Sequence, residues 1–215
     1  MAHIVASNAV HNIVKERSCH ETMQIYKNWA KDLDTHCMEL KYNAPKIMAD
    51  VVEDLHLPKD IQILDVAAGS GLVGIELKKT GYTNIDALDG SQELLNIAKE
   101  RKIYNKYFKA LLGENRRSPI ENDTYDVVVV CGGFAPGHLY TDSFPELIRV
   151  VKPDGYICWT MRDYSHYSER FRNEKFDEGV NQLCNAGLWK KVREPYTKSG
   201  YFDGTDAKIY CMQVI

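Results

Sequence analysis

The stretch that decides the fold is "ILDVAAGSGLVGIEL", residues 63–77. It begins with residues typical of a buried strand, passes a carboxylate at Asp65, reaches Gly69 and Gly71, and continues as an amphipathic run. In a strand–loop–helix unit, such glycines remove side chains where the backbone turns sharply and approaches a ligand. The free amide groups of the loop therefore predict a site for a nucleotide-like ligand.

A second carboxylate, Asp89, closes the next strand-like run, residues 85–89, and Gly90 follows it. An acid at the end of that strand is where ribose hydroxyls find a hydrogen-bond acceptor. The glycine loop alone is a weak signal, because isolated glycines also mark ordinary tight turns. The loop and the acid together predict an adenosyl group.

Strand-like runs alternate with helical patterns along most of the chain. The predicted strands are 61–66, 85–89, 107–112, 125–131 and 156–161, and helices are predicted over 92–102 and from Asp142 or Ser143 to just before the Lys152-Pro153-Asp154-Gly155 turn. Residues 189–196 and 207–215 are two further strand-like runs that a glycine-rich turn joins as a hairpin. We expect an α/β, Rossmann-like fold with a seven-stranded, mostly parallel sheet and helices on both faces.

The chain of 215 residues, with 44% hydrophobic residues, suits one domain with one sizeable core. Residues 1–55 have helical patterning without a strand, so we expect a helical cap or lid that belongs to the same domain. Residues 56–215 then form the core.

The amino-acid composition indicates which binding partners and which cellular compartment to expect. A formal net charge of −3 supplies no general basic field, so nucleic acid is not the expected partner. Six scattered cysteines without a CxxC pair predict a reducing, cytoplasmic location and no metal site. No apolar run approaches the length of about 18 residues that spans a bilayer, so we expect a soluble protein without a membrane partner.

Three motifs carry a family resemblance: "DVAAGSG" at 65–71, "ENDTYDVVVVCGGF" at 121–134 and "ELIRVVKPDGYICW" at 146–159. They resemble the first motif, the fourth strand and the fifth strand of the class I S-adenosylmethionine-dependent methyltransferases. Ala67 stands where that family has its first glycine. The segment "YKNWAKDLDTHCMELKYNAP", residues 26–45, adds a narrower resemblance, to methyltransferase-like proteins related to the one from the Williams-Beuren syndrome chromosomal region.

The resemblance implies S-adenosylmethionine as the cofactor. Together with the glycine loop and the acid at the end of the second strand, it implies cofactor contacts from several parts of the chain. Main-chain amides after the third strand would meet the adenine, the fourth strand would contribute Cys131, and aromatic rings of the cap would attract the sulfonium. The implied cofactor-binding residues are Tyr26, Trp29, Tyr42, Asp65, Ala67, Gly69, Gly71, Asp89, Gly90, Leu112, Gly113 and Cys131.

Methyl transfer from a sulfonium needs a near-attack geometry more than a dedicated base. His138 and Phe134 follow the fourth strand, at the edge where open α/β sheets bind ligands, and Arg162 and Asp163 follow the fifth. His138 and Arg162 are therefore the candidate catalytic residues, and spacing does not choose between them.

Three functions fit these residues. The favoured one is a methyltransferase that acts on a small molecule. A nicotinamide-dependent oxidoreductase would share the glycine loop, but the chain lacks the Tyr-Lys spacing that such enzymes use near Tyr104 and Tyr107. A non-catalytic S-adenosylmethionine-binding protein is compatible with every motif, because all of them serve the cofactor.

Overall fold

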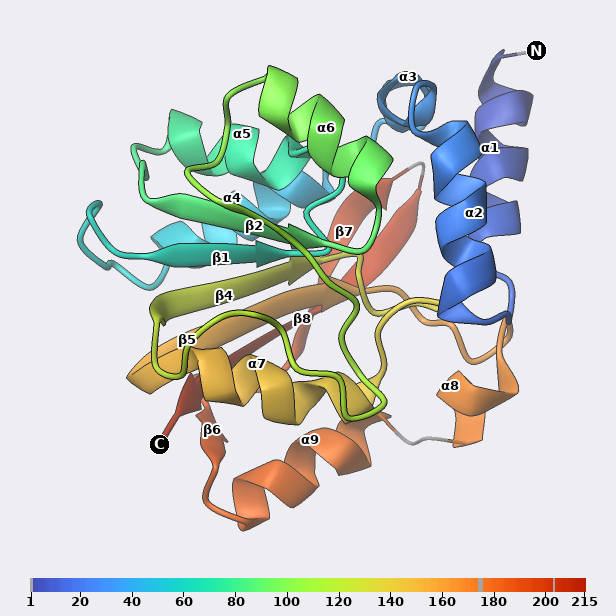
Figure 1. Ribbon diagram of the computed structural model, residues 1–215. Helices are drawn as coiled ribbons and strands as arrows, with labels where there is room; N and C mark the ends of the chain where they lie inside the picture. Colours follow the sequence, from blue (N-terminus) through green and yellow to red (C-terminus); the bar gives the residue numbers. More distant parts are fainter. Residues whose placement is uncertain (1, 174–175, 203) are drawn as a thin grey trace.

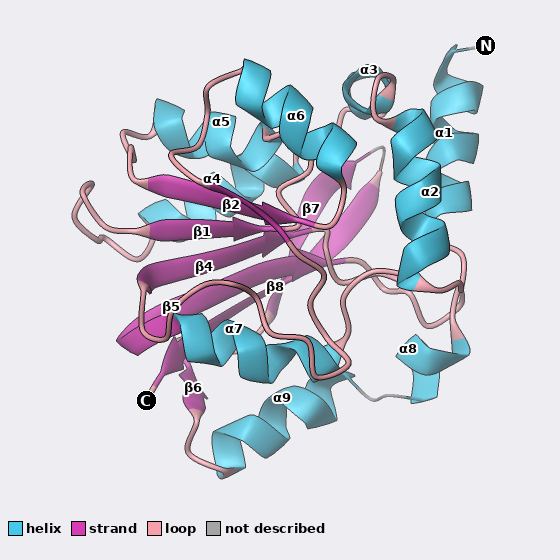
Figure 2. Ribbon diagram, viewed as in Figure 1, coloured by secondary structure: helices cyan, strands magenta, loops and turns pink. Residues whose placement is uncertain are grey.

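A computed structural model describes residues 2–173, 176–202 and 204–215. The described chain forms one sheet of eight strands, shown in Figures 1 and 2. The strands are β1 (Ile63–Val66), β2 (Ile85–Asp89), β3 (Tyr107–Lys109), β4 (Tyr125–Cys131), β5 (Val151–Met161), β6 (Trp189–Lys191), β7 (Tyr196–Phe202) and β8 (Thr205–Val214).

The strand order is β3-β2-β1-β4-β5-β8-β6, and β7 also pairs with β8. Neighbours from β3 to β5 are parallel, whereas β8 runs antiparallel to β5, β6 and β7. The predicted mostly parallel sheet is confirmed. The glycine loop and the residues after β2, β4 and β5 therefore meet at one edge of the sheet.

The C-terminal strands differ from the prediction in number. The expected strand over 189–196 is two strands, because Pro195 has no N–H group to continue the ladder. Both β6 and β7 pair with the side of β8 that β5 leaves free, so β7 occupies much of the expected glycine-rich turn. Two boundaries also move: β3 ends at Lys109 rather than at residue 112, and β5 begins at Val151, before the predicted turn, and runs through it.

Helices cover both faces of the sheet. One face carries α4 (Ala44–Glu53), α5 (Leu72–Lys79) and α6 (Gln92–Glu100), and the other carries α7 (Phe144–Val150) and α9 (Phe176–Asn185), as Figure 2 shows. A short 3-10 turn, η1 (Thr141–Ser143), precedes α7, and α8 (Glu169–Asn173) precedes α9. As predicted, Ser91 caps α6, with its hydroxyl accepting a hydrogen bond from Leu94 N at 3.3 Å.

Three N-terminal helices lie beside the carboxyl ends of β1 and β2: α1 (Ala2–Ile13), α2 (Cys19–Trp29) and α3 (Leu33–Glu39) (Figure 1). The start of α2 is fixed by a capping box between Ser18 and Glu21. The fourth helix of the range 1–55 behaves differently, because Ile47, Met48 and other apolar residues of α4 are buried against the sheet. We use the name cap below for α1, α2 and α3.

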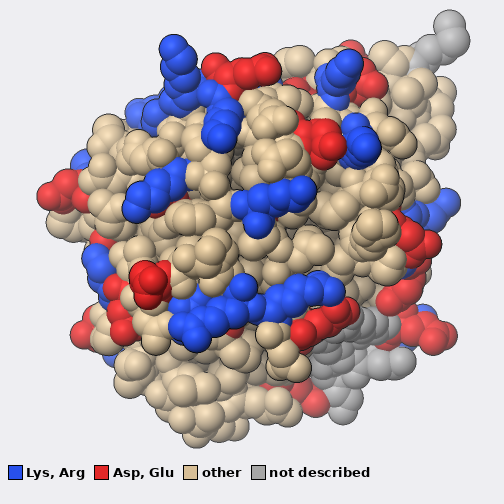
Figure 3. All heavy atoms as spheres, viewed as in Figure 1, with Lys and Arg blue, Asp and Glu red and all other residues tan. Residues whose placement is uncertain are grey.

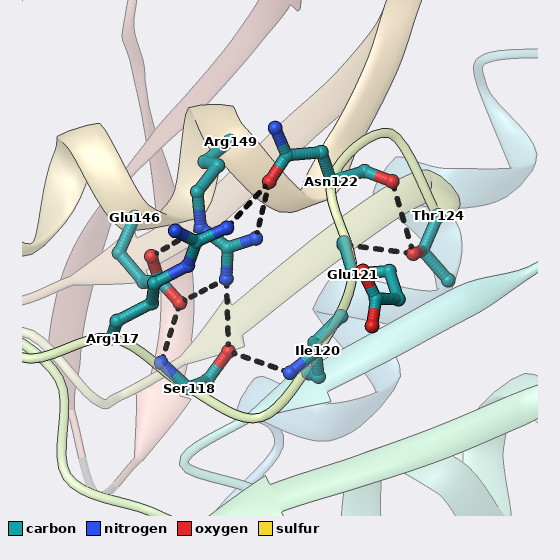
Figure 4. Close-up of polar contacts among 8 residues, drawn as sticks. All are labelled: Arg117, Ser118, Ile120, Glu121, Asn122, Thr124, Glu146 and Arg149. Carbon is teal, nitrogen blue, oxygen red and sulfur yellow. Dashed lines mark hydrogen bonds and ion pairs between the residues drawn. The ribbon is translucent and has the colours of Figure 1, made fainter.

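Polar contacts fix the loop between β3 and β4 against α7 (Figure 4). Glu146 accepts hydrogen bonds from Ser118 N at 2.7 Å and from Arg149 at 2.6 Å. Arg149 and Arg117 both donate to the side-chain oxygen of Asn122. The first residues of this loop lie at the carboxyl edge of the sheet. The contacts with α7 therefore help to fix the position of a segment that contributes to the candidate site.

Candidate cofactor and substrate site

A cavity of about 220 Å³ lies between the carboxyl edge of the sheet and the cap. Its walls come from the glycine loop, from the residues after β2, β4 and β5, and from the three cap helices. The predicted residues that line it are Tyr26, Trp29, Tyr42, Ala67, Gly69, Asp89, Gly90, Leu112, Cys131, His138 and Arg162. Residues from distant parts of the sequence are therefore gathered around one space.

The glycine loop presents bare backbone to this cavity. Gly69 has a φ of +58°, and a Cβ built there meets no atom within 4 Å. Ala67 also lies in the left-handed region, with a φ of +57°, which is the conformation that the missing family glycine would adopt without strain. The open space beside Gly69 suits the close approach of a ligand.

Asp89 joins the loop to the end of β2. Its carboxylate accepts hydrogen bonds from Gly69 N at 2.8 Å and from Ser91 N at 2.7 Å. Burial raises the pKa of Asp89 above the ordinary value for an aspartate, although both amides favour the charged form. Because each carboxylate oxygen retains acceptor capacity, the group fits a ribose diol at the cavity wall.

Asp65, in contrast, is buried beneath the cavity and does not line it. Its Oδ2 accepts a hydrogen bond from the Tyr104 hydroxyl at 2.6 Å, and its Oδ1 has no partner among the described residues. Burial raises the pKa of Asp65 to about 7. The structure thus places this acid below the cavity lining, where it holds Tyr104 under the loop.

Gly71 and Gly113 also lie outside the cavity lining, and packing accounts for both. A Cβ on Gly71 would lie 2.5 Å from Ile103, and one on Gly113 would lie 2.8 Å from a carboxylate oxygen of Asp142. Both have a positive φ that favours glycine. Leu112, the other residue expected near the adenine, does line the cavity.

Aromatic side chains of the cap and the adjoining segment form the wall opposite the loop. Tyr26 and Trp29 stack with ring centroids 5.9 Å apart, and Tyr42 meets Tyr201 edge-on at 5.5 Å. The Tyr42 hydroxyl lies 3.8 Å from Cys131 Sγ. Burial raises the pKa of Cys131 to about 12, which keeps it a neutral thiol.

His138 is held at both ring nitrogens. Nδ1 lies 2.8 Å from Pro136 O, and Nε2 lies 2.9 Å from the Tyr26 hydroxyl. Burial lowers the pKa of His138 to about 4, so the ring is neutral at pH 7. Because a carbonyl can only accept, the proton lies on Nδ1 and Nε2 carries the lone pair that accepts from Tyr26.

The other two residues considered on the substrate side do not reach the cavity. Phe134 is fully buried and packs its ring against Phe144, Trp159 and Phe176, so it belongs to the core. The Asp163 carboxylate turns back to accept a hydrogen bond from Ser165 N at 2.9 Å.

Sequence reasoning missed a polar contact that joins the cap to the glycine loop. Ser70 Oγ donates to Asp34 Oδ1 at 2.5 Å, and Arg101, just after α6, pairs with the same carboxylate. Arg101 also donates to Ser70 O at 3.1 Å. We call Asp34, Ser70 and Arg101 the latch. No short motif marks it, because its members are more than thirty positions apart.

Further lining residues come from places with little sequence signal. Met23 of α2 approaches Gly90 so closely that a Cβ there would lie 2.8 Å from its sulfur. Tyr201 belongs to β7, the strand that was expected to be a turn. The one available signal was the Gly132-Gly133 pair after β4, where a Cβ on Gly133 would lie 3.0 Å from the Ala67 methyl. Within the described ranges, no group of His, Cys, Asp and Glu is arranged to hold a metal ion.

Known proteins share both the sequence pattern and the fold. A family model described as a methyltransferase domain matches residues 63–155. A solved S-adenosylmethionine-dependent methyltransferase from Aquifex aeolicus superposes with a TM-score of 0.55 over 80% of this chain and 93% of its own, at 20% identity.

Two curated relatives narrow the assignment. Demethylmenaquinone methyltransferase from Staphylococcus aureus is 26% identical over 62% of this chain, which spans 57% of that protein. Human methyltransferase-like protein 27 is 31% identical over 172 residues, which are 79% of this chain and 69% of the human protein. With this identity across most of both proteins, the chain belongs to the class I S-adenosylmethionine-dependent methyltransferases.

Proposed function

We propose that this methyltransferase acts on a small molecule that is enclosed with the cofactor beneath the cap. The carrying observation is the cavity itself, which the cap covers and which offers about 220 Å³. Three contacts hold the cover in place: Ser70 with Asp34, Tyr26 with His138, and the Cys19 thiol with the carbonyl oxygen of His138. A folded protein or a nucleic acid duplex does not fit in such a space.

The lining residues suggest a role for each wall. We assign the contact with the ribose to Asp89 and the contact with the adenine to Leu112. The cofactor would approach the main chain at Ala67, Gly69 and Gly90. Tyr26, Trp29 and Tyr42 would face the sulfonium, since aromatic faces attract cations within about 6 Å. Cys131, a neutral thiol, would be a packing contact.

Bound S-adenosylmethionine supplies a methyl group whose bond to sulfur breaks with its electron pair passing to sulfur. The chain's own contribution is to exclude water and to hold the acceptor in line. His138 Nε2 carries a lone pair that now accepts from Tyr26, and it can accept from an acceptor O–H or N–H instead. The proton displaced as the new bond to carbon forms would pass to this nitrogen.

Charge distribution supports a small acceptor. On the face shown in Figure 3, groups of Lys and Arg lie next to Asp or Glu in several places. Arg116 pairs with Glu114 at 2.5 Å, and Lys152 pairs with Asp126 at 2.8 Å. Such pairs reduce the field that would attract a phosphate backbone. Among the described helices, none is both long and apolar enough to cross a bilayer.

A labelling experiment tests the proposal. The protein is incubated with S-adenosylmethionine labelled in its methyl group, and with either the small-molecule filtrate or the macromolecular fraction of a cell extract. We expect label to enter the filtrate, and to do so far less with Asp89→Ala. Label that enters only protein or nucleic acid would refute a small-molecule acceptor.

We also propose the narrower grouping with proteins related to that of the Williams-Beuren region. The identity to a human methyltransferase-like protein supports it. The cap would then be a lid, with residues 1–55 and 56–215 working as one domain.

A further inference from the structure

Arg162 is the charged residue of the cavity wall that the cofactor assignment leaves unused. It directly follows β5 and lines the cavity. The side chain is partly exposed, but its Nε is buried and has no hydrogen-bond partner among the described residues. Two other arginines of the fold differ in this respect, because Arg101 pairs with Asp34 and Arg149 pairs with Glu146.

Aromatic rings hold the Arg162 guanidinium without neutralising it. Its central carbon lies 4.5 Å from the ring centroid of Phe202, 5.5 Å from that of Tyr164 and 5.9 Å from that of Tyr167. Stacking on ring faces orients the planar group and leaves its N–H donors available. The nearest acid in sequence, Asp163, accepts from Ser165 N instead.

Arg162 is partly exposed, yet its buried Nε–H has no acceptor, and a buried donor left unpaired beside a largely apolar cavity is costly. A carboxylate or a phosphate fits it best, since both accept two parallel hydrogen bonds from the guanidinium fork. The site therefore lacks an anion that a ligand can supply.

Sheet order indicates which ligand supplies the anion. The glycine loop follows β1 and Asp89 ends β2, whereas Arg162 follows β5, two strands away from β1 on the other side of β4. Neighbouring strands are about 4.8 Å apart, so the two sides of the site are separated by about 10 Å. Arg162 thus lies on the side of the site away from the residues assigned to the adenosyl group.

We propose that Arg162 binds an anionic group of the methyl acceptor, so that the substrate is a small organic acid with an apolar or aromatic body. This inference rests on the proposed function, because it specifies the acceptor of the same cavity. The surrounding Tyr164, Tyr201 and Phe202, all of them lining residues, would contact the apolar body.

Three probes with the same ring test the proposal: benzoate, phenyl phosphate and neutral benzyl alcohol. Each is titrated calorimetrically into the full chain saturated with S-adenosylhomocysteine. We expect benzoate or phenyl phosphate to bind and benzyl alcohol not to bind. The anion that binds more tightly identifies the acceptor as a carboxylic acid or a phosphate ester.

The variants are Arg162→Gln, Arg162→Lys and a matched control, Arg193→Gln. Arg193 also lies over a ring, 4.7 Å from the centroid of Tyr196, but it pairs with Asp54 and does not line the cavity. Arg162→Gln should weaken anion binding about 10- to 100-fold, the effect of losing hydrogen bonds to a charged group. Arg193→Gln should bind like the wild type. Arg162→Lys keeps the charge and should bind the anion more tightly than Arg162→Gln. It therefore keeps the test valid if Arg162→Gln fails to fold.

Titration with S-adenosylhomocysteine alone separates the possible failures. Unchanged affinity in Arg162→Gln supports an anchor for the acceptor. If Arg162→Gln also lost affinity for S-adenosylhomocysteine, Arg162 would bind the cofactor's own carboxylate. If wild type and Arg162→Gln bound the probe anions equally, Arg162 would not bind the acceptor's anion. Either result overturns the inference. If S-adenosylhomocysteine binds the wild type but no anion does, this inference fails and the small-molecule proposal stands on its labelling test.

Discussion

A methyl group added at Gly69 tests whether the loop is the place where ligand and backbone meet. Gly187 provides a matched control, because it has a φ of +71° against +58° for Gly69 and, as at Gly69, a built Cβ meets no atom within 4 Å. Only Gly69 lines the cavity. Replacing either glycine by alanine should cost about 1 to 2 kcal/mol, the strain of a left-handed L-residue. For a chain of this length, the melting temperature should fall by about 2 to 8 °C in both variants.

Binding should separate the two variants. The new methyl group of Gly69→Ala stands in the space that the ligand approaches, so the affinity for S-adenosylhomocysteine should fall by at least a factor of about ten, or about 1.4 kcal/mol. Gly69→Val, with a branched side chain, should abolish binding. Gly187→Ala should bind like the wild type in the same calorimetric titration. If Gly69→Ala binds as tightly as the wild type while both variants lose stability, the loop is not the contact surface.

Three further predictions concern an acid at the cavity, an acid below it and the cap. Asp89→Ala should weaken S-adenosylhomocysteine binding by about 1.5 to 3 kcal/mol, and an unchanged calorimetric dissociation constant in the folded variant would remove the ribose assignment. Asp65 holds its proton more tightly in the folded protein, with a pKa of about 7, than in the unfolded chain, where the value is about 4. The free energy of unfolding should therefore fall as the pH rises from about 4 to about 7, and chemical denaturation should show a shallower fall for Asp65→Asn; identical pH profiles would contradict this. Hydrogen exchange over residues 20–45 should slow more on adding S-adenosylhomocysteine than exchange in β1 and β4, and equal protection in both states would mean a fixed cap.

The parallel half of the sheet could be predicted because its signals are local. Residues 85–89 and 125–131 are strand-like runs bounded by turn-forming residues, and they coincide with the observed β2 and β4. The C-terminal half of the sheet was harder to predict from the sequence, because the division at Pro195 and the pairing of β7 depend on which side of β8 is free. That information lies in tertiary contacts rather than in the pattern.

The candidate site shows the same division. Gly69 and Asp89, which line the cavity, could be proposed from sequence because a nucleotide-binding loop constrains residue type at fixed positions. Asp65 has the same sequence signal, yet its partner Tyr104 comes from after α6 and pulls it into the core. Trp29 of the cap and Tyr42, just after it, line the cavity because of how these segments fold over the sheet, which no spacing rule in the sequence specifies.

The latch has a kinetic consequence. Asp34 contacts both Ser70 and Arg101, so a ligand that orders the glycine loop also stabilises α3, and by reciprocity an ordered α3 strengthens the binding of that ligand. The side chains of Arg101 and Asp34 are 33% and 23% exposed, so added salt reaches this ion pair and weakens it. We therefore expect the residence time of S-adenosylhomocysteine, the cofactor product, to shorten as ionic strength rises. Where product departure limits turnover, a moderate salt concentration should make the enzyme faster.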